Sequence, residues 1–421
     1  MTSSKDEQYT PIRTAILGFC LPAMEALDAH GRPFVAVVPE EFRGYMEQYD
    51  IPHVCWDFGR VNEQSERLAL QLSERGVKVA VPLYEETVEW AGALNGHFRQ
   101  DKRLFTRYLL FRDKAMMKRR AQMYGIRVGV FEEADDTEAV ERFFHRVNTA
   151  MSKIEGDIKD PIHLKPLNAA GSLGHEMIKS EEDIRKLTEK NFPCLLETHL
   201  NGQEFSCEVF VHNKKIRFLN ITEYIHLGYS NFVPASETLE SRREQIKQAI
   251  QDLIDAFDIE YGMIHPEFFI TPDNKISFGE VAARVPGGHI FELIEKAHGF
   301  NPFVGFTLCA DPETTEEELQ AFFPRYNAAE QYAGCLMVYP KQSVITHAEM
   351  PEEVLAHPYY EKHNLFIPSN PKVAEREAFG NHYGTIYFQG KDPEEMRKLL
   401  QDYEHLDFYA STDPKAKQKE S

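Results

Sequence analysis

The chain lacks several features of secreted and membrane proteins. Its 421 residues include only six cysteines, which are scattered and form neither a CxxC pair nor a metal-ligand spacing. Such cysteines indicate reduced thiols rather than a disulfide framework. No apolar run reaches the length of about 18 residues that a membrane helix needs. The polar start MTSSKDEQYT has no apolar signal-peptide core. We therefore expect a cytoplasmic protein with no membrane partner.

Positive charge is also scarce. The chain has 47 Lys+Arg against 67 Asp+Glu, which gives a formal net charge of −20. This excess of acid argues against nucleic acid or an anionic membrane surface as the main partner, although a few local cations suffice to bind phosphate. Hydrophobic residues make up 42% of the chain and charged residues 27%, which is typical of globular enzymes, and the length allows two to four compact units.

The first part of the chain alternates strand and helix patterns. Buried strands are expected at Arg13–Phe19, Phe34–Val38 and Val77–Val81, with helices at Pro22–Ala29 and about 62–75 between them. This order predicts a parallel sheet. The first turn, Gly18–Pro22, is not a GxGxxG fingerprint, so we interpret the unit as a packing domain rather than a dinucleotide site.

Two lysines and a loop of small residues follow. A basic helix is expected over Arg112–Tyr124 with Lys114 near its start, and a strand over Ile162–Pro166 carries Lys165. The next residues, LNAAGSLGH, could place backbone N–H groups around a phosphate, with Lys165 as the accompanying charge. They do not form a GxxxxGK[ST] motif, so an ordinary flexible turn remains the alternative.

The segment from Tyr261 to Glu292 carries a pair of acids. Ile264–Ile270 and Ile276–Val281 are expected strands of a hairpin with Asp273–Asn274 at its tip. In that register Glu267 faces Glu280, and opposed carboxylates repel unless they share a proton or a cation. Oxygen ligands with room for phosphate suit Mg²⁺. The alternative is an exposed hairpin with two incidental acids. Arg284, four residues after Glu280, adds a fixed cation.

Further elements complete the expected organisation. A strand Pro193–Leu200 precedes a hairpin of Glu204–Val211 and Lys215–Thr222, and a long helix covers about 239–257. Near the end, strands are expected at Tyr332–Tyr339 and His382–Phe388, a helix at Pro393–Tyr403, and a disordered polar tail after them.

Taken in order, these motifs resemble the ATP-grasp carboxylate–amine ligases. The resemblance covers about residues 112–300, and EVAARVPGGHI is more similar to the L-amino-acid ligase (dipeptide synthetase) branch. It implies an α/β and α+β protein: an ATP-grasp fold with an N-terminal Rossmann-like parallel-sheet domain and a C-terminal α+β domain. The implied boundaries are 1–110, 111–193 (lid), 194–310 (metal site), 311–412, and a tail 413–421.

The resemblance also implies cofactors and site residues. ATP and Mg²⁺ are expected, with Mn²⁺ as a substitute. Glu267 and Glu280 would bind the metal, and Arg284 would contact the phosphoryl groups. The implied nucleotide contacts are Lys114, Lys165, Gly171, Ser172, Gly174, His175, Glu197, Leu200 and Glu204. One departure is Ala282, where many members of the family have an asparagine as a further metal ligand.

The expected reaction joins a small carboxylate, such as an amino acid, to an amine through an acyl phosphate, with release of ADP and phosphate. His226 and His289 are candidates to line the amino-acid site or to take a proton from the amine, because an unperturbed imidazole titrates near pH 6.5. Structural histidines are the alternative. An ATP-grasp carboxylase of purine or biotin type and a non-catalytic nucleotide-binding scaffold are the other functions considered. A homodimer is left open, as are the identities of both substrates.

Overall fold

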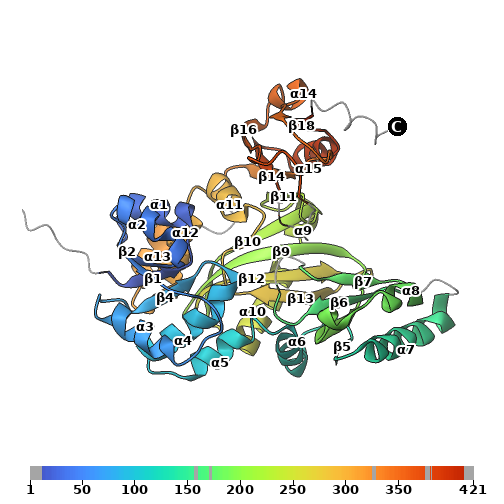
Figure 1. The fold of residues 1–421 in the computed structure, drawn as a ribbon, viewed down its shortest axis with the longest axis horizontal. Coiled ribbons are helices and arrows are strands. Elements are labelled where there is room, and N and C mark those ends of the chain that lie inside the picture. Colours follow the sequence, from blue (N-terminus) through green and yellow to red (C-terminus); the bar gives the residue numbers. More distant parts are fainter. Residues whose placement is uncertain are drawn as a thin grey trace, which may run out of the picture.

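The computed structural model describes residues 12–155, 160–169, 173–324, 329–374, 380 and 382–411. Its first sheet is parallel, as expected, in the order β3-β2-β1-β4 (Figure 1). The strands are β1 (Thr14–Leu17), β2 (Phe34–Val38), β3 (His53–Cys55) and β4 (Val79–Pro82). The helices are α1 (Leu21–Ala29), α2 (Arg43–Gln48), α3 (Gln64–Ser73), α4 (Val88–Phe98) and α5 (Arg103–Leu109). The pattern of the sequence predicted neither β3 nor α4 and α5.

A smaller antiparallel sheet follows, in the order β5-β8-β6-β7. Its strands are β5 (Phe131–Ala134), β6 (Ile162–Pro166), β7 (Glu176–Ile178) and β8 (Cys194–Thr198), and its helices are α7 (Thr137–Glu155) and α8 (Glu181–Arg185). Strand β6 has the predicted bounds. The sheet packs one face on α7 through a separate apolar core that includes Phe143, Phe144 and Leu196. The opposite face is left for polar side chains.

The third sheet is antiparallel and has the order β13-β12-β9-β10-β11-β14-β17-β16. Its strands are β9 (Gln203–His212), β10 (Lys215–His226), β11 (Ser230–Val233), β12 (Tyr261–Ile270), β13 (Ile276–Ala282), β14 (Tyr332–Val338), β16 (Tyr360–Leu365) and β17 (Gly384–Gly390). Strands β14, β16 and β17 belong to the expected C-terminal domain, yet β11 pairs directly with β14. The C-terminal part therefore extends this sheet, although it has a core of its own.

The helices of this part are α9 (Glu237–Glu240), α10 (Arg243–Phe257), α11 (Ile290–His298), α12 (Pro302–Ala310), α13 (Glu316–Phe322), α14 (Glu352–Leu355) and α15 (Pro393–Tyr403), and β15 (His347–Ala348) pairs with β18 (Tyr409–Ala410). The single helix expected over 239–257 is two helices. Helix α12 is apolar almost all round and buried, as expected for a helix enclosed by other elements. Its residues share one apolar core with the parallel sheet and the large sheet.

Alternation along the strands gives the large sheet two unlike faces at its β9–β13 end. Phe205, Cys207 and Val209 of β9 point into an apolar core with α10 and with α6 (Lys114–Met123). The alternate residues of β9, Glu204, Ser206 and Glu208, lie on the other face. Helix α6 also contacts both β13 and β5, so it joins the large sheet to the smaller one.

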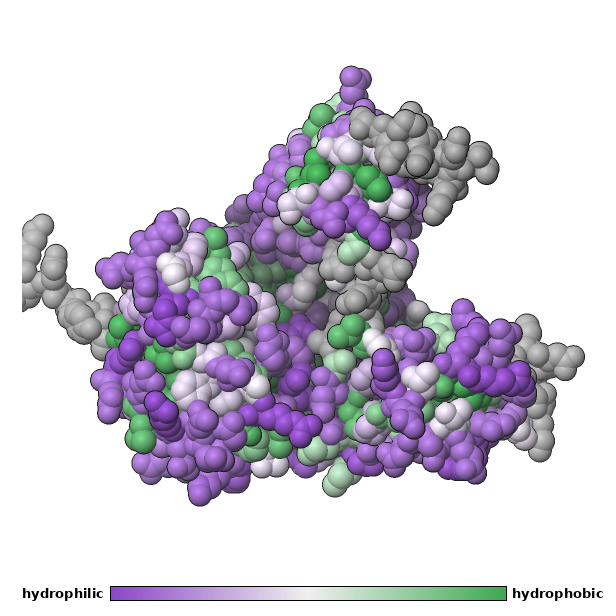
Figure 2. Space-filling model, viewed as in Figure 1, coloured by the Kyte–Doolittle hydropathy of each residue, from purple (hydrophilic) through white to green (hydrophobic). Residues whose placement is uncertain are grey.

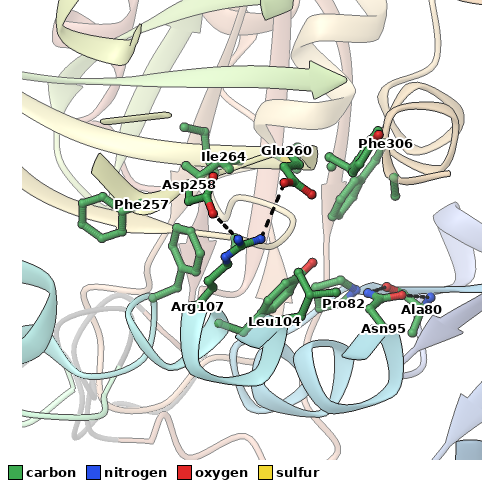
Figure 3. A pocket seen from close by; sticks show the side chains of 18 of the residues that line it. Ala80, Pro82, Asn95, Leu104, Arg107, Phe257, Asp258, Glu260, Ile264 and Phe306 are labelled. Carbon is green, nitrogen blue, oxygen red and sulfur yellow. Dashed lines mark hydrogen bonds and ion pairs between the residues drawn. The ribbon is translucent and has the colours of Figure 1, made fainter. Parts of the chain in front are cut away.

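Figure 2 shows the molecule hollowed where the N-terminal part, the smaller sheet and the C-terminal part meet. A different cavity lies between α5 and the start of β12, where Arg107 pairs with Asp258 and Glu260 (Figure 3). That cavity has a volume of about 40 Å³, far below the roughly 300–1,000 Å³ of ligand pockets. That cavity is therefore too small for such a ligand, and the hollow is the candidate functional site. Within the described ranges, no helix is both long and apolar enough to cross a membrane.

Candidate functional site

The two acids of the hairpin lie opposite each other, which confirms the predicted register. Glu267 of β12 pairs with Glu280 of β13. The turn itself differs from the prediction. Ile270 pairs with Ile276, which shifts the register by one residue, and a bulge next to Glu267 shifts it back. Gly279 lies at this bulge, and a Cβ there would come within 3.0 Å of the Glu267 carbonyl oxygen. The bulge thus leaves little room for a side chain at position 279 and turns both carboxylates to one face.

Lys114 binds one of these two carboxylates. Its Nζ donates to Glu280 Oε2 at 2.9 Å. Asp113 caps the start of α6 by accepting from the N–H of Met116, which fixes the helix end that carries Lys114. Burial alone would raise the pKa of Glu280, but Lys114 and Lys165 outweigh it and lower that pKa to about 2. Glu280 is therefore ionised at neutral pH.

The smaller sheet contributes a carboxylate between two lysines. Glu197 Oε1 accepts from Lys118 Nζ at 2.5 Å and Glu197 Oε2 accepts from Lys165 Nζ at 3.0 Å. Burial would raise the pKa of Glu197, but the two ammonium groups lower it to about 2. Lys118 was not predicted as a site residue. It lies one helical turn after Lys114 in the same basic helix. This i, i+4 spacing places both lysines on one face of the helix and could have identified Lys118 as a site residue.

Among the residues that the structure describes, no lysine or arginine forms an ion pair with Glu204. It lies on β9, paired with Phe269 of β12. Burial, reinforced by the negative charge of Glu267, raises the pKa of Glu204 to about 8. Glu204 and the Glu267–Glu280 pair thus form an acidic surface on the polar face of the large sheet. Among the described residues, no group of three or more His, Cys, Asp or Glu side chains is arranged to hold a metal by itself. The surface instead suits an ion that takes its remaining ligands from phosphate and water.

Arg284 reaches from the end of the hairpin to the N-terminal part of the chain. Its Nε donates to Glu85 Oε2 at 2.9 Å, and Arg112 donates to Glu85 Oε1 at 2.6 Å. All three side chains are largely buried. Sequence reasoning missed Glu85 and Arg112, because no local pattern links residues so far apart. The arrangement brings the N-terminal part against the acidic hairpin.

His289 follows Arg284 in the segment that leads from the hairpin to α11. It has a left-handed backbone conformation (φ 57°) at the start of α11. Tyr387 Oη is 3.0 Å from its Nδ1 and Thr385 Oγ1 is 3.0 Å from its Nε2, both from β17. Glu292 Oε1 is 3.4 Å from Nδ1. The imidazole therefore connects the start of α11 to strand β17.

His226 is placed differently. Its ring is stacked on Tyr229 with centroids 4.3 Å apart, and its Nδ1 pairs with Glu404 after α15. More than half of its side chain is exposed. Tyr229 and Glu404 also line a cavity of about 340 Å³ in the C-terminal part. The contacts of His226 thus point to the C-terminal region rather than to the hairpin acids.

The remaining predicted residues lie on or beside the smaller sheet. Gly171 and Ser172 fall outside the described residues. Gly174 has φ +69°, and Leu200 lies in the connection from β8 to β9. His175 belongs to a chain of imidazoles that sequence reasoning missed: His163 Nδ1 is 2.7 Å from His175 Nε2, and its Nε2 is 2.8 Å from His199 Nδ1. Burial and the charge of Lys165 lower the pKa of His163 to about 3 and that of His175 to about 4.

Comparison with known proteins assigns the class. A family model described as an ATP-grasp domain matches residues 158–292, the span that holds Lys165, Glu197, Glu204 and the hairpin acids. The chain therefore contains an ATP-grasp domain, and its α/β and α+β architecture is that of the ATP-grasp fold. This confirms the expected family resemblance and fold class.

Two curated proteins are similar to part of the chain. An L-arginine-specific L-amino acid ligase of Bacillus subtilis is 23% identical over 56% of this chain and 59% of its own. A D-alanine–D-alanine ligase of Caldicellulosiruptor bescii is 28% identical over 45% of this chain and 55% of its own. The chain thus matches little more than half the length of either curated relative.

Solved structures extend the likeness to the whole chain. An L-amino acid ligase of Bacillus licheniformis has a TM-score of 0.73 at 16% identity and covers 96% of this chain and all of its own. An N5-carboxyaminoimidazole ribonucleotide synthetase of Thermotoga maritima has a TM-score of 0.66, also at 16% identity, covering 95% of this chain and all of its own. At these identities the likeness defines the fold.

Proposed function

We propose that the protein is an ATP-dependent carboxylate–amine ligase that activates a small carboxylate, an amino acid, as an acyl phosphate and joins it to the amine of a second amino acid. ADP and phosphate are the co-products. The observation that carries the proposal is the opposed pair Glu267 and Glu280, with Lys114 and Lys165 beside it, inside an ATP-grasp domain.

The nucleotide would lie between the smaller sheet and the polar face of the large sheet. Lys114 and Lys165 are near enough to act together on Glu280, so their ammonium groups can meet phosphate oxygens next to the acidic pair. Glu204 would bind the ribose hydroxyls, and the backbone of Glu197 to Leu200 would face the adenine edge. The loop that contains Gly171, Ser172, Gly174 and His175 would cover the phosphates.

The acidic pair fits a divalent cation. Two opposed carboxylates repel each other unless a cation or a proton lies between them, and Mg²⁺ commonly binds through one or two carboxylates plus substrate phosphates. Bound Mg²⁺, or Mn²⁺ in its place, would offset the negative charge of the transferring phosphoryl group. Lys114 already occupies one oxygen of Glu280, which leaves Glu280 Oε1 and the Glu267 carboxylate for the metal.

The chemistry explains why cations surround the site. A carboxylate is a poor electrophile, so ATP must convert it to an acyl phosphate before an amine can attack. Phosphoryl transfer depends mainly on positioning and on charge stabilisation, which the lysines and Arg284 would provide. Arg284 presents a planar fork of donors that suits both phosphate and carboxylate oxygens. Glu85 accepts from Arg284 Nε and so fixes the direction of that fork.

The amine must lose a proton before it attacks. His289, between Glu292 and the β17 side chains, is the candidate for shaping the amino-acid pocket, and His226 is the second candidate base. If either acts as base, its replacement by alanine will shift the pH–rate profile of the ligase. Wild-type profiles for both variants would assign the proton to water, to phosphate or to another group.

The proposal is tested by measuring ADP release with a panel of amino acids, singly and in pairs, and by identifying products with mass spectrometry. A ligase requires both a carboxylate and an amine. ADP release that depends on bicarbonate would instead indicate a carboxylase, and its absence under all conditions would indicate a nucleotide-binding scaffold. Arg284→Lys should lose most of the turnover while still binding ATP, because lysine lacks the fork of donors.

A further inference from the structure

A fully buried carboxylate lies on the polar face of the large sheet, apart from the residues assigned above. Glu208 of β9 has no exposed surface. It accepts from Asn220 Nδ2 at 2.6 Å, from Thr222 Oγ1 at 2.7 Å and from Ser206 Oγ at 3.2 Å. All three donors are neutral amide and hydroxyl groups. Side chains of β9 and β10 thus fix the orientation of the Glu208 carboxylate.

His265 supplies the fourth contact of Glu208. Its Nδ1 lies 3.0 Å from Glu208 Oε1, and its Nε2 lies 3.6 Å from Glu267 Oε1. Only 7% of the His265 side chain is exposed. Both ring nitrogens thus face carboxylate oxygens, which accept and do not donate. The imidazole is held between a buried acid and one member of the hairpin pair.

The order of the strands places Glu208, the partner of His265, on one side of Glu267 and Glu280 on the other. The strand order is β13-β12-β9, so Glu208 on β9 and Glu280 on β13 lie on opposite sides of the strand that carries Glu267. His265 and Glu267 are two residues apart on β12 and therefore project from the same face. His265 can restrain Glu267 from the β9 side and leave its β13 side open toward Glu280.

Each hairpin acid then has its own positioning side chain. Lys114 holds Glu280 at 2.9 Å, and the imidazole of His265 faces Glu267 from the opposite side. We propose that His265, fixed by Glu208 and its hydroxyl and amide donors, is the positioning residue that aims the Glu267 carboxylate at the divalent cation. This inference rests on the proposed function, because it takes Glu267 and Glu280 as the metal ligands.

The proposal is tested by the affinity for Mn²⁺ in the presence of a non-hydrolysable ATP analogue, measured from the electron paramagnetic resonance signal of free Mn²⁺. Removing a group that orients a metal ligand typically weakens metal binding by about 10- to 100-fold. We expect Glu208→Gln and His265→Asn to weaken Mn²⁺ binding by that factor while the far-UV circular dichroism stays that of the folded protein. Thr222→Val, which removes one donor to Glu208, should have a smaller effect in the same direction.

Glu223→Gln is the matched control. Glu223 is also a fully buried carboxylate of this sheet, on β10, but it pairs with Arg397 of α15 at 2.6 Å and accepts from the N–H of Ser236. The same chemical change there should lower thermal stability and leave Mn²⁺ affinity within about twofold, because Glu223 contacts neither His265 nor the hairpin acids.

Several outcomes would overturn the inference. Wild-type Mn²⁺ affinity in Glu208→Gln and His265→Asn would do so, as would an equal loss in Glu223→Gln, which would mean that any buried acid of the sheet has the same effect. If Glu208→Gln and His265→Asn do not fold, wild-type Mn²⁺ affinity in Thr222→Val would contradict the proposal. Failure of the proposed function is distinguishable, because Glu280→Gln would then bind Mn²⁺ as tightly as the wild type.

Discussion

Glu197 and Glu204 are carboxylates on two different sheets that both interact with Lys165, but their charges are balanced in opposite ways. Glu197 is nearly fully buried and bonded to Lys118 and Lys165, so its pKa is lowered to about 2 despite burial. Burial and the charge of Glu267 raise the pKa of Glu204 to about 8. The protein thus supplies two cations to Glu197 of the smaller sheet, whereas burial and a neighbouring acid dominate the environment of Glu204 on the large sheet.

This difference separates two uses of a buried acid. An acid such as Glu197, with a lysine bonded to each oxygen, has its charge balanced within the protein and holds both lysines in place. An acid that faces other acids favours a proton or a cation from outside the chain. We therefore expect the large-sheet acids to govern turnover and the Glu197 cluster to govern stability and lysine placement. The following predictions test that contrast.

The largest effect is expected at the acidic hairpin. Glu280→Gln should reduce turnover by at least about 10³-fold, because it removes a charged ligand from the site of phosphoryl transfer. Circular dichroism should remain that of the folded protein. Glu244→Gln on the exposed face of α10 is the control and should keep wild-type turnover. Near wild-type turnover in Glu280→Gln would remove the proposed metal site.

The Glu197 cluster should instead control stability. Lys118→Met would leave the buried Glu197 with one cation in place of two and should lower the free energy of unfolding by about 3 kcal/mol. Urea denaturation measures the change. Lys186→Met is the control, because Lys186 pairs with Glu182 on the surface and such pairs contribute about 0–1 kcal/mol. A loss below about 1 kcal/mol for Lys118→Met would contradict the assigned role of the cluster.

The two acids should also give opposite dependences of stability on pH. The folded pKa of Glu197 is below its usual value near 4.5, so its contribution is present above about pH 4.5 and is lost as the pH falls toward 2. The folded pKa of Glu204 is above its usual value, so its contribution is lost as the pH rises from about 4.5 through 8.

Urea denaturation of the metal-free protein between pH 5 and 9 tests the second of these. Glu204→Gln should remove about 4 kcal/mol of the decline in unfolding free energy seen in the wild type over this range. The acid-side loss, governed by Glu197, should be unchanged in that variant. An identical decline in wild type and Glu204→Gln would show that Glu204 is not held protonated.

The smallest effect is expected at Lys165. Lys165→Ala should weaken ATP binding by about tenfold in calorimetry, since one of the two lysines proposed to face phosphate is lost while Lys114 remains. The fold should survive, because Lys118 still pairs with Glu197. An unchanged dissociation constant would assign Lys165 to the structural cluster alone.

Much of this site could be predicted from local patterns. Strand β6 with Lys165 has the predicted bounds, and the opposition of Glu267 and Glu280 followed from alternation along a hairpin. Even there, the pattern did not indicate that the turn has five residues between the paired strands. The bulge at Gly279 cancels the register shift that this longer turn introduces. Predicted roles for the nucleotide-binding residues stay predictions until they are measured.

Contacts between distant segments could not be predicted in the same way. Arg284 meets Glu85, which is 199 positions away, and His289 meets Tyr387, 98 positions away. His226, chosen with His289 on equal grounds, pairs with Glu404 instead. Nothing in the neighbouring residues distinguishes these partners, because each depends on where a separate part of the chain packs.

The sequence by itself determined the alternation of strands, the two faces of β9 and β12, the basic helix and the acidic pair, since these depend on residues within a few positions of each other. Tertiary structure decided that Lys118 is buried on Glu197, that His265 lies between Glu208 and Glu267, and that β14 continues the ATP-grasp sheet. Burial and ion pairing are properties of the assembled layers, and they assign different environments to residues that look alike in the sequence.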